Sequence, residues 1–154
     1  MENVDFVIER SNLENAKLVP GLGPDAPLEA GEALLRVEVF GLTANNITYG
    51  MTGDVLGYWN FFPVADPDWG RIPVWGFASV EKSRHDGLGE GERLFGYLPM
   101  SNFFRVRPDQ VEASHFHDAT AHRATLHPWY NRLYRTEGDP LYDPALADLF
   151  FDEL

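Results

Sequence analysis

The segment ANNITYG, residues 44–50, places two amides and a phenol in one short stretch. The side chains of Asn45 and Asn46 can orient a carbonyl group by hydrogen bonding, but amides cannot pass a proton at neutral pH. The phenol of Tyr49 can donate one. Asparagine also suits turns, because it tolerates left-handed backbone and bonds to its own main chain. The residue types therefore leave two interpretations open: the lining of a small-molecule pocket, and a capped loop.

An aromatic run, YWNFF, follows at residues 58–62. Exposed aromatic loops often mark ligand or partner surfaces, whereas buried ones hold a loop against a core. Trp75 falls within a strand pattern, so we expect it in the core. No residue type or spacing identifies a catalytic group. The candidate pocket residues are Asn45, Asn46, Tyr49, Tyr58 and Trp59.

Four of the five histidines fall within a short segment, at positions His115, His117, His122 and His127. An H-x-H pair with a third histidine is a pattern that zinc or nickel can use. However, the H-E-x-x-H spacing is absent, and steps of five residues do not share a helix face. We therefore expect surface or helix-capping roles and no metal, with metal binding by residues 115–127 as the alternative.

The composition is that of a folded, acidic protein. The chain has 154 residues, enough for one hydrophobic core, and its 24 acidic against 12 basic residues give a net charge of −12. Such a charge repels phosphate backbones and anionic lipid, so no nucleic-acid or membrane partner is expected. The chain contains no cysteine, which rules out thiolate zinc sites and agrees with a cytoplasmic location. The first residues also lack the apolar core of a secretory signal.

Alternation of apolar and polar residues predicts strands at 3–10, 33–42, 72–83, 93–99 and 101–108. In the second of these, Leu35, Val37 and Val39 are expected on one face. The first is expected at a sheet edge, and residues 42–71 are expected to form a long loop. Residues 1–108 are therefore predicted to form an antiparallel, partly closed barrel. Helices are predicted mainly within 115–154, one beginning near Pro128 and one at Pro144.

Three stretches, GEALLRVEVFGLTANNITYGMTGD, RIPVWGFASVEKS and GLGEGERLFGYLP, resemble the N-terminal GroES-like domain of the medium-chain dehydrogenase/reductase superfamily. The resemblance covers about residues 30–108. The later stretch HRATLHPWYNRLYR is similar to a poorly characterised bacterial branch of that superfamily. The resemblance implies a mainly β (α+β) fold: a GroES-like, partly closed β-barrel over residues 1–114, and a helical extension over 115–154 that leads toward a cofactor domain absent from this chain.

The resemblance also implies a chemistry. Thr43 and Phe77 occupy the positions of a cysteine and a histidine that bind zinc in other members, and neither is a plausible zinc ligand. The similarity is thus to zinc-independent, quinone-reductase-like branches, in which this loop lines the substrate pocket. Asn45 falls near a position that often carries a proton-relaying hydroxyl, and Asn46 near a common aspartate.

The expected function is the substrate-side domain of a zinc-independent NAD(P)H-dependent oxidoreductase-like protein. The alternative is a non-catalytic module, with the same fold, that binds a small ligand or another protein. The segment GLGEGE, residues 87–92, lacks the spacing and flanking elements of a dinucleotide fingerprint and is expected to be a tight surface turn. We therefore expect no cofactor in this chain, with NADP or NAD implied for a longer parent, and the chain alone to be inactive.

The end of the chain has an apolar stripe formed by Leu146, Leu149 and Phe150. A short helix is marginal in water unless such a stripe is buried. We expect the stripe either to dock on the barrel or to support a weak homodimer through a C-terminal helix.

Overall fold

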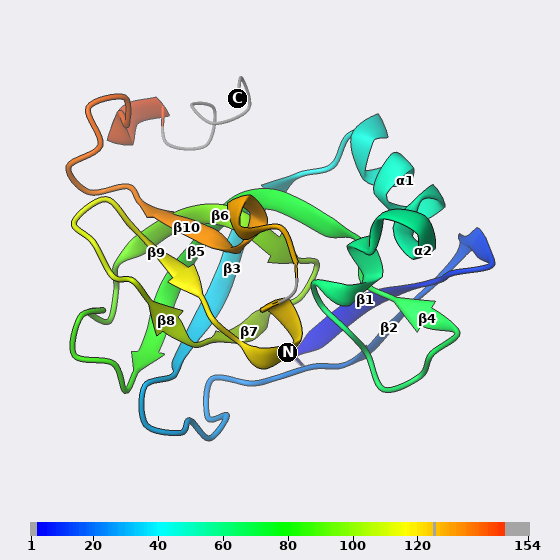
Figure 1. The fold of residues 1–154 in the computed structure, drawn as a ribbon, viewed down its shortest axis with the longest axis horizontal. Coiled ribbons are helices and arrows are strands. Elements are labelled where there is room, and N and C mark those ends of the chain that lie inside the picture. The colour runs from blue at the N-terminus through cyan, green and yellow to red at the C-terminus, as the bar shows by residue number, and fades with distance from the viewer. Residues whose placement is uncertain (1–2, 125, 147–154) are drawn as a thin grey trace.

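The computed structural model describes residues 3–124 and 126–146, which form two antiparallel sheets (Figure 1). The smaller sheet has the order β2-β1-β4, with β1 Val4–Glu9, β2 Asn12–Pro20 and β4 Trp69–Gly70. The first strand therefore lies in the middle of a sheet, and its expected place at an edge is wrong. The prediction missed β2, although its residues pair with β1 almost throughout their length.

The larger sheet has seven strands in the order β7-β3-β5-β6-β10-β9-β8. Its strands are β3 Ala33–Gly41, β5 Pro73–Ser83, β6 Arg93–Pro99, β7 Phe103–Val106, β8 Pro108–Asp109, β9 His115–Asp118 and β10 Arg132–Arg135. Every ladder among them is antiparallel. The predicted strands at 72–83, 93–99 and 101–108 correspond to β5, β6 and β7, and the mainly β fold is confirmed.

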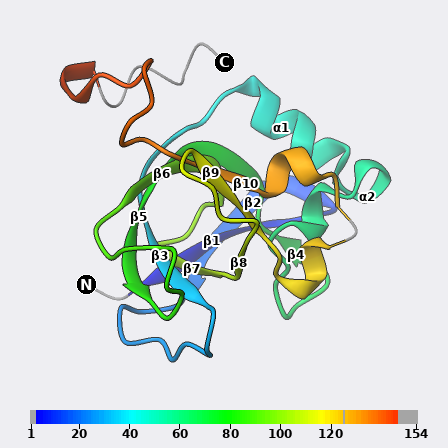
Figure 2. The same cartoon turned by 60° about the vertical axis from the view of Figure 1, so that its left-hand side comes forward.

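This sheet curls into a nearly closed barrel (Figure 2). Its two end strands, β7 and β8, are consecutive in the chain and are separated only by Arg107. The N–H of Arg107 donates to Asp118 Oδ1 at 3.0 Å, and its carbonyl accepts from the N–H of Ala119 at 2.9 Å. These bonds connect the residue between β7 and β8 to the end of β9 and to the residue after it, and so extend the pairing of β8 with β9.

Irregular pairing modifies the pattern expected for β3. Its register against β5 shifts between Leu34 and Leu35 and again between Val37 and Val39. Because a register shift changes which face a residue occupies, Leu34 and Leu35 are both fully buried while Val39 is 38% exposed. The buried half of β3 anchors the strand, and its far end emerges at the surface just before the candidate site.

Within the described residues, the α-helices are not where the sequence pattern placed them, and most of the second predicted helix, which begins at Pro144, lies outside the described residues. The two α-helices of the described residues are α1 Ala44–Met51 and α2 Gly53–Leu56, followed by a 3-10 turn, η1 Tyr58–Asn60. All three lie in the segment expected to be a long loop. The expected helical segment from residue 115 instead contributes β9 and β10, with single 3-10 turns at η2 Ala121–Arg123, η3 Pro128–Asn131 and η4 Pro144–Leu146.

The error at η3 and β10 has a physical cause. Pro128 does start a turn, as predicted, because its fixed φ suits the first helical position. The chain then becomes extended at Arg132, and Leu133 pairs with both Gly96 of β6 and Phe116 of β9. The helix-like spacing of Tyr130 and Leu133 therefore arises from a turn followed by a strand. Pairing with two neighbouring strands outweighs local propensity here.

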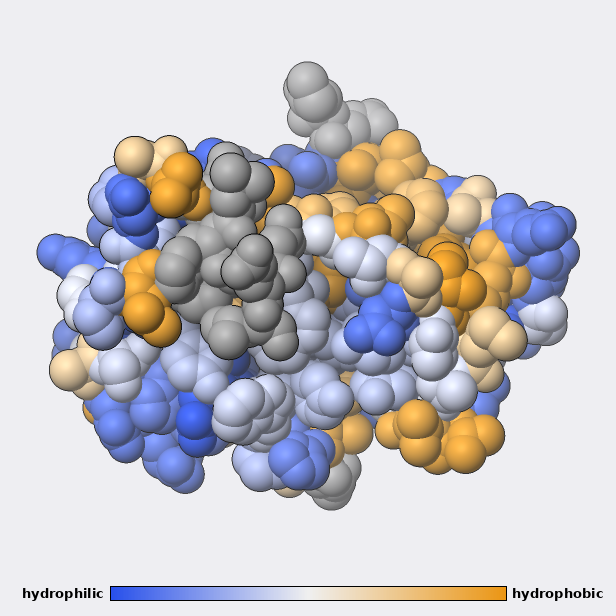
Figure 3. All heavy atoms as spheres, turned by 90° about the horizontal axis from the view of Figure 1, so that it is seen from above, coloured by the Kyte–Doolittle hydropathy of each residue, from blue (hydrophilic) through white to orange (hydrophobic). Residues whose placement is uncertain are grey.

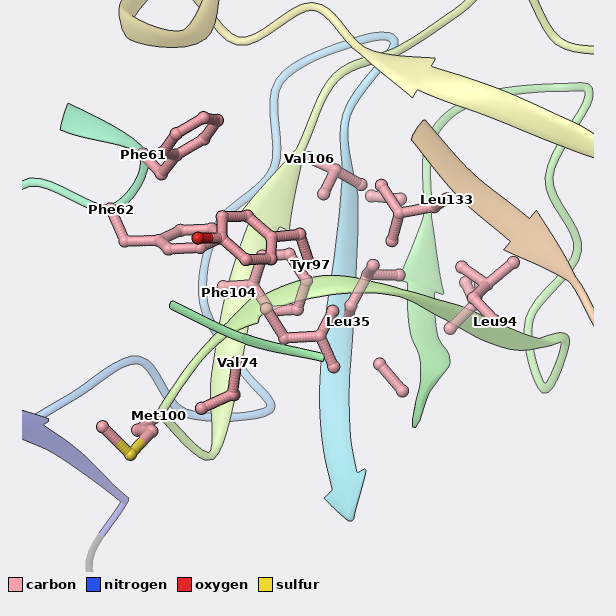
Figure 4. Packing of buried hydrophobic residues seen from close by; sticks show 14 of the residues in the cluster. Leu35, Phe61, Phe62, Val74, Leu94, Tyr97, Met100, Phe104, Val106 and Leu133 are labelled. Carbon is pink, nitrogen blue, oxygen red and sulfur yellow. The ribbon is translucent and has the colours of Figure 1, made fainter. Parts of the chain in front are cut away.

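Aliphatic and aromatic side chains fill the barrel (Figure 4). Leu35, Val74, Leu94 and Leu133 are each 0% exposed. Burial of each such side chain contributes about 1.5–3 kcal/mol as an upper bound. The described residues include no helix long and apolar enough to cross a membrane. Of the predicted C-terminal stripe, Leu146 is exposed, whereas Leu149 and Phe150 lie outside the described residues.

Candidate functional site

Asn46 fixes the start of α1. Thr43 is the N-cap: its hydroxyl accepts from the N–H of Asn45, and its own N–H donates to Asn46 Oδ1 at 2.6 Å, which completes a capping box. Asn46 Nδ2 donates to the carbonyl of Pro73 at 2.9 Å and thereby ties α1 to β5. Asn46 is only 3% exposed. Its amide is thus engaged within the protein, as the capped-loop interpretation expects.

The other four candidate pocket residues lie in three different environments. Asn45 is exposed on the first turn of α1. Trp59 is 2% exposed and lies against Gly53 and Gly70, where a Cβ atom would collide with its indole ring. Trp59 is therefore a core residue that seats α2 on the small sheet. Tyr49 and Tyr58 are half-buried, and their ring centroids lie 4.5 Å apart.

Tyr49 and Tyr58 belong to a group of four phenols, which we call the tyrosine cluster: Tyr49, Tyr58, Tyr97 and Tyr130. The members come from α1, η1, β6 and η3. The Tyr97 ring lies 4.8 Å from that of Tyr130 and 5.8 Å from that of Tyr49, measured between centroids. Four of the six tyrosines of the chain thus converge on one place.

Aromatic rings enclose this cluster. Trp75 of β5 lies 5.1 Å from Tyr97 and 6.1 Å from Tyr130 between ring centroids. Phe61 meets Tyr97 edge-on at 5.2 Å, a favourable arrangement for aromatic pairs. Trp75 was expected in the core, but its side chain is only half-buried. The cluster therefore has a buried centre and a partly exposed rim.

The surroundings favour the protonated phenols of Tyr97 and Tyr130. Burial, together with the hydrogen bond that the Tyr130 hydroxyl donates to Tyr58, raises the pKa of Tyr130 to about 12. Burial also raises the pKa of Tyr97, and the neighbouring phenols of Tyr49, Tyr130 and Tyr58 raise it further. At neutral pH these groups are hydrogen-bond donors and not bases. Tyr97 Oη has no hydrogen-bond partner among the described residues.

A buried ion pair positions Tyr130. Arg123 and Asp118 have side chains 1% exposed, and Nη1 of the arginine lies 2.9 Å from Oδ2 of the aspartate. Arg123 also donates to Asn131 Oδ1 and to the carbonyl of Tyr130, each at 2.9 Å. The remaining oxygen of Asp118 accepts from Thr120 and Arg107. Because each partner is fully engaged, this network anchors η3 on the barrel.

The histidines do not gather into one group. The rings of His115 and His117 are neighbours on β9, with centroids 5.6 Å apart. His122 Nε2 donates to the carbonyl of Phe61 at 3.0 Å, and burial lowers the pKa of His122. His127 caps η3. In the described part of the chain, no group of three or more His, Asp or Glu side chains is placed to hold a metal ion.

The residues that sequence reasoning missed are Tyr97 and Tyr130. Tyr97 lies in β6, whose residues from Leu94 to Pro99 are all buried. A tyrosine inside a strand buried on both faces puts a polar atom into the core, and that signal was present in RLFGYLP. Tyr130 had no comparable signal, because its place depends on Arg123, Asp118 and Asn131, which meet only in the folded chain.

Comparison with known proteins gives one finding. A family model described as "Protein of unknown function (DUF2855)" matches residues 40–151. The match begins at the exposed end of β3 and contains every member of the tyrosine cluster. No curated protein matches the chain.

Proposed function

The chain belongs to the DUF2855 family, and from its site we propose that it forms the substrate-side domain of a zinc-independent, NAD(P)H-dependent oxidoreductase-like protein. Two observations support the proposal. Three stretches resemble the GroES-like domain of medium-chain dehydrogenases/reductases, and α1 lies directly after the first of their strands. That helix follows β3, whose sequence resembles the opening strand of such domains. In their zinc-dependent members, a metal ligand stands where Thr43 caps α1.

The observation that supports this proposal best is that α1 has two different faces. One face directs Tyr49 toward the tyrosine cluster. The other belongs to an exposed apolar surface that extends from the end of β3 to α2 (Figure 3). This surface is formed by Phe40, Leu42, Ile47, Met51, Val55 and Leu56, which are 37–86% exposed. No charged residue occurs between Glu38 and Asp54 in this strongly acidic chain.

Continuous apolar surfaces of this kind commonly mark contact with another protein or domain. Because the tyrosine cluster adjoins this surface, a partner that covered α1 would also close over the cluster. Exclusion of water strengthens hydrogen bonds from the phenols to a substrate carbonyl. The phenol hydroxyls of Tyr49 and Tyr58 can donate hydrogen bonds to such a carbonyl, which polarises it and holds it in one orientation.

The residues of this chain do not themselves fit a dinucleotide. The N–H groups of Gly89 and Gly91, in the turn between β5 and β6, donate to Glu92 Oε1 and to the carbonyl of Val80. Two glutamates, Glu90 and Glu92, stand where phosphates would need positive charge. A nicotinamide cofactor would supply the hydride, and under this proposal its site lies on a separate domain.

The same observation favours a second candidate function. A barrel without a dinucleotide site, with a cluster of phenols beside an apolar surface, also suits a non-catalytic module that binds a small ligand or a protein. The two candidates share the cluster but differ in the need for a cofactor domain.

The reading frame of the gene tests the proposal. We expect the frame to continue past the Leu154 codon into a strand, a glycine-rich turn and a helix, and the encoded polypeptide to oxidise NADPH or NADH with a carbonyl acceptor. Replacement Tyr49→Phe should lower kcat/KM by about 100-fold if the phenol transfers a proton in the reaction. A stop codon directly after Leu154, or a longer protein that oxidises neither cofactor, would leave the module as the function.

A further inference from the structure

The centre of the tyrosine cluster contains a polar atom without a partner. Tyr97 is 0% exposed, and its Oη makes no hydrogen bond to the described residues. A buried hydroxyl that lacks an acceptor is costly and therefore uncommon in folded proteins. Figure 4 shows the hydroxyl pointing toward Phe61 and Phe62, away from the aliphatic part of the core around Leu94 and Leu133. Phe61 in turn contacts the rings of Tyr58 and Tyr130, so the hydroxyl points toward a residue that these two cluster members also contact.

Partly exposed rings form the rim around Tyr97. Tyr49, Trp75 and Tyr130 each contact its ring and are each half-buried. Flat aromatic faces of this kind bind planar apolar groups by stacking and by excluding water. Tyr130 is the one of the three that lies on a short turn, η3, and its carbonyl accepts from Arg123.

Charge limits what the cluster can accept. The nearest buried cation is Arg123, whose ring contacts are with Phe61 and Phe62. Its guanidinium is already engaged by Asp118, Asn131 and the carbonyl of Tyr130. An anion placed among these rings would lose its hydration without gaining a free counter-charge, which is unfavourable. A neutral hydrogen-bond acceptor avoids that cost.

We propose that the tyrosine cluster is a binding site for a neutral, planar small molecule that carries a hydrogen-bond acceptor, and that Tyr97 Oη donates to this acceptor. The ligand displaces the ring of Tyr130 and stacks between Tyr49 and Trp75. The inference rests on the proposed function, in which the cluster is the substrate region. The binding itself requires neither a cofactor nor a second domain.

Three fused bicyclic probes of similar size separate the elements of this proposal. Coumarin is planar, neutral and has a lactone carbonyl; naphthalene is planar and neutral but lacks the acceptor; coumarin-3-carboxylate adds a negative charge. Calorimetric titration of the isolated chain should show saturable binding of coumarin, weaker binding of naphthalene and no measurable binding of the carboxylate. Absence of saturable coumarin binding up to its solubility limit would overturn the proposal, as would tightest binding of the carboxylate.

Tyr97→Phe tests the donor directly, since it keeps the ring and removes only the hydroxyl. We expect it to weaken coumarin binding by about three- to tenfold, the value of one hydrogen bond, and to leave naphthalene binding unchanged. The matched control is Tyr134→Phe, because Tyr134 lies on β10 beside His115 and outside the cluster. Equal affinity of the Tyr97→Phe variant for coumarin, or an equal loss in Tyr134→Phe, would overturn the assignment of Tyr97.

The outcome also distinguishes the two proposals. Coumarin binding that depends on Tyr97, together with a longer protein that does not oxidise NAD(P)H, would retain the binding site and reject the oxidoreductase. NAD(P)H oxidation without coumarin binding by this chain would retain the oxidoreductase and reject this site.

Discussion

The rings of Tyr97 and Tyr130 lie 4.8 Å apart between centroids, although one belongs to a central barrel strand and the other to a single 3-10 turn. The contact exists because the ion pair of Arg123 and Asp118 holds that turn against the barrel. It creates a site in which protonated phenols adjoin both a buried core and an exposed apolar surface. This relationship underlies the binding and the function proposed above.

The alkaline titration of Tyr130 should be delayed in the folded protein. Its pKa is raised from 10.0 to about 12, so between these values the unfolded chain releases a proton that the native state keeps. The contribution of Tyr130 to the free energy of unfolding is therefore fully present below about pH 10 and is lost as the pH rises toward 12. Tyrosinate absorbance of the wild-type protein should reveal tyrosines that ionise only at high pH. The Tyr130→Phe variant should show one fewer of them. A Tyr134→Phe variant that removed the same late step would contradict the assignment.

Replacement of Asn46 should cost stability, whereas replacement of Asn45 should not. Asn46→Ala removes the acceptor for the N–H of Thr43 and the donor to Pro73. We expect a loss of about 1–3 kcal/mol in the free energy of unfolding, measured by urea denaturation. The exposed neighbour gives the matched control, Asn45→Ala, with a change within about 0.5 kcal/mol. If Asn46→Ala left stability intact and abolished coumarin binding instead, the pocket-lining interpretation would be correct.

Loss of the Arg123 guanidinium should both destabilise the barrel and release Tyr130. Arg123→Met leaves the carboxylate of Asp118 buried without its counter-charge, which typically costs about 3–5 kcal/mol. Asp118→Asn should cost a similar amount, because it leaves the guanidinium of Arg123 buried without its counter-charge, although an amide oxygen can still accept from the N–H of Arg107. Denaturation measures the first effect, and earlier titration of Tyr130 in the Arg123→Met variant measures the second. A loss below about 1 kcal/mol would show that the pair does not anchor η3.

Four of the barrel strands, β3, β5, β6 and β7, could be predicted from apolar patterning and turn residues, whereas β9 and β10 lie in a segment predicted to be helical. RLFGYLP and FFRV pair as expected, and so does most of the strand beginning at Pro73. The helices were not readable. α1 is short, and its stability comes from a capping box and from the bond between Asn46 and Pro73, which joins residues distant in the chain.

The site was readable only in part, for the same reason. Tyr49 and Tyr58 stood out as phenols in an unusual aromatic segment, and the structure brings them together. Asn46 and Trp59 have the residue types of a pocket, but their side chains are used in a cap and in the core. Tyr97 and Tyr130 are placed by β-sheet pairing and by a buried network, neither of which local sequence spacing reveals.

Intermolecular NOE measurement tests the central claim most directly. The isolated chain, labelled on its tyrosine rings and saturated with coumarin, should give ligand contacts to Tyr49, Tyr97 and Tyr130 and none to Tyr134 or Tyr142. Contacts confined to Tyr134 and Tyr142, or no contact to any tyrosine ring at saturation, would contradict the account.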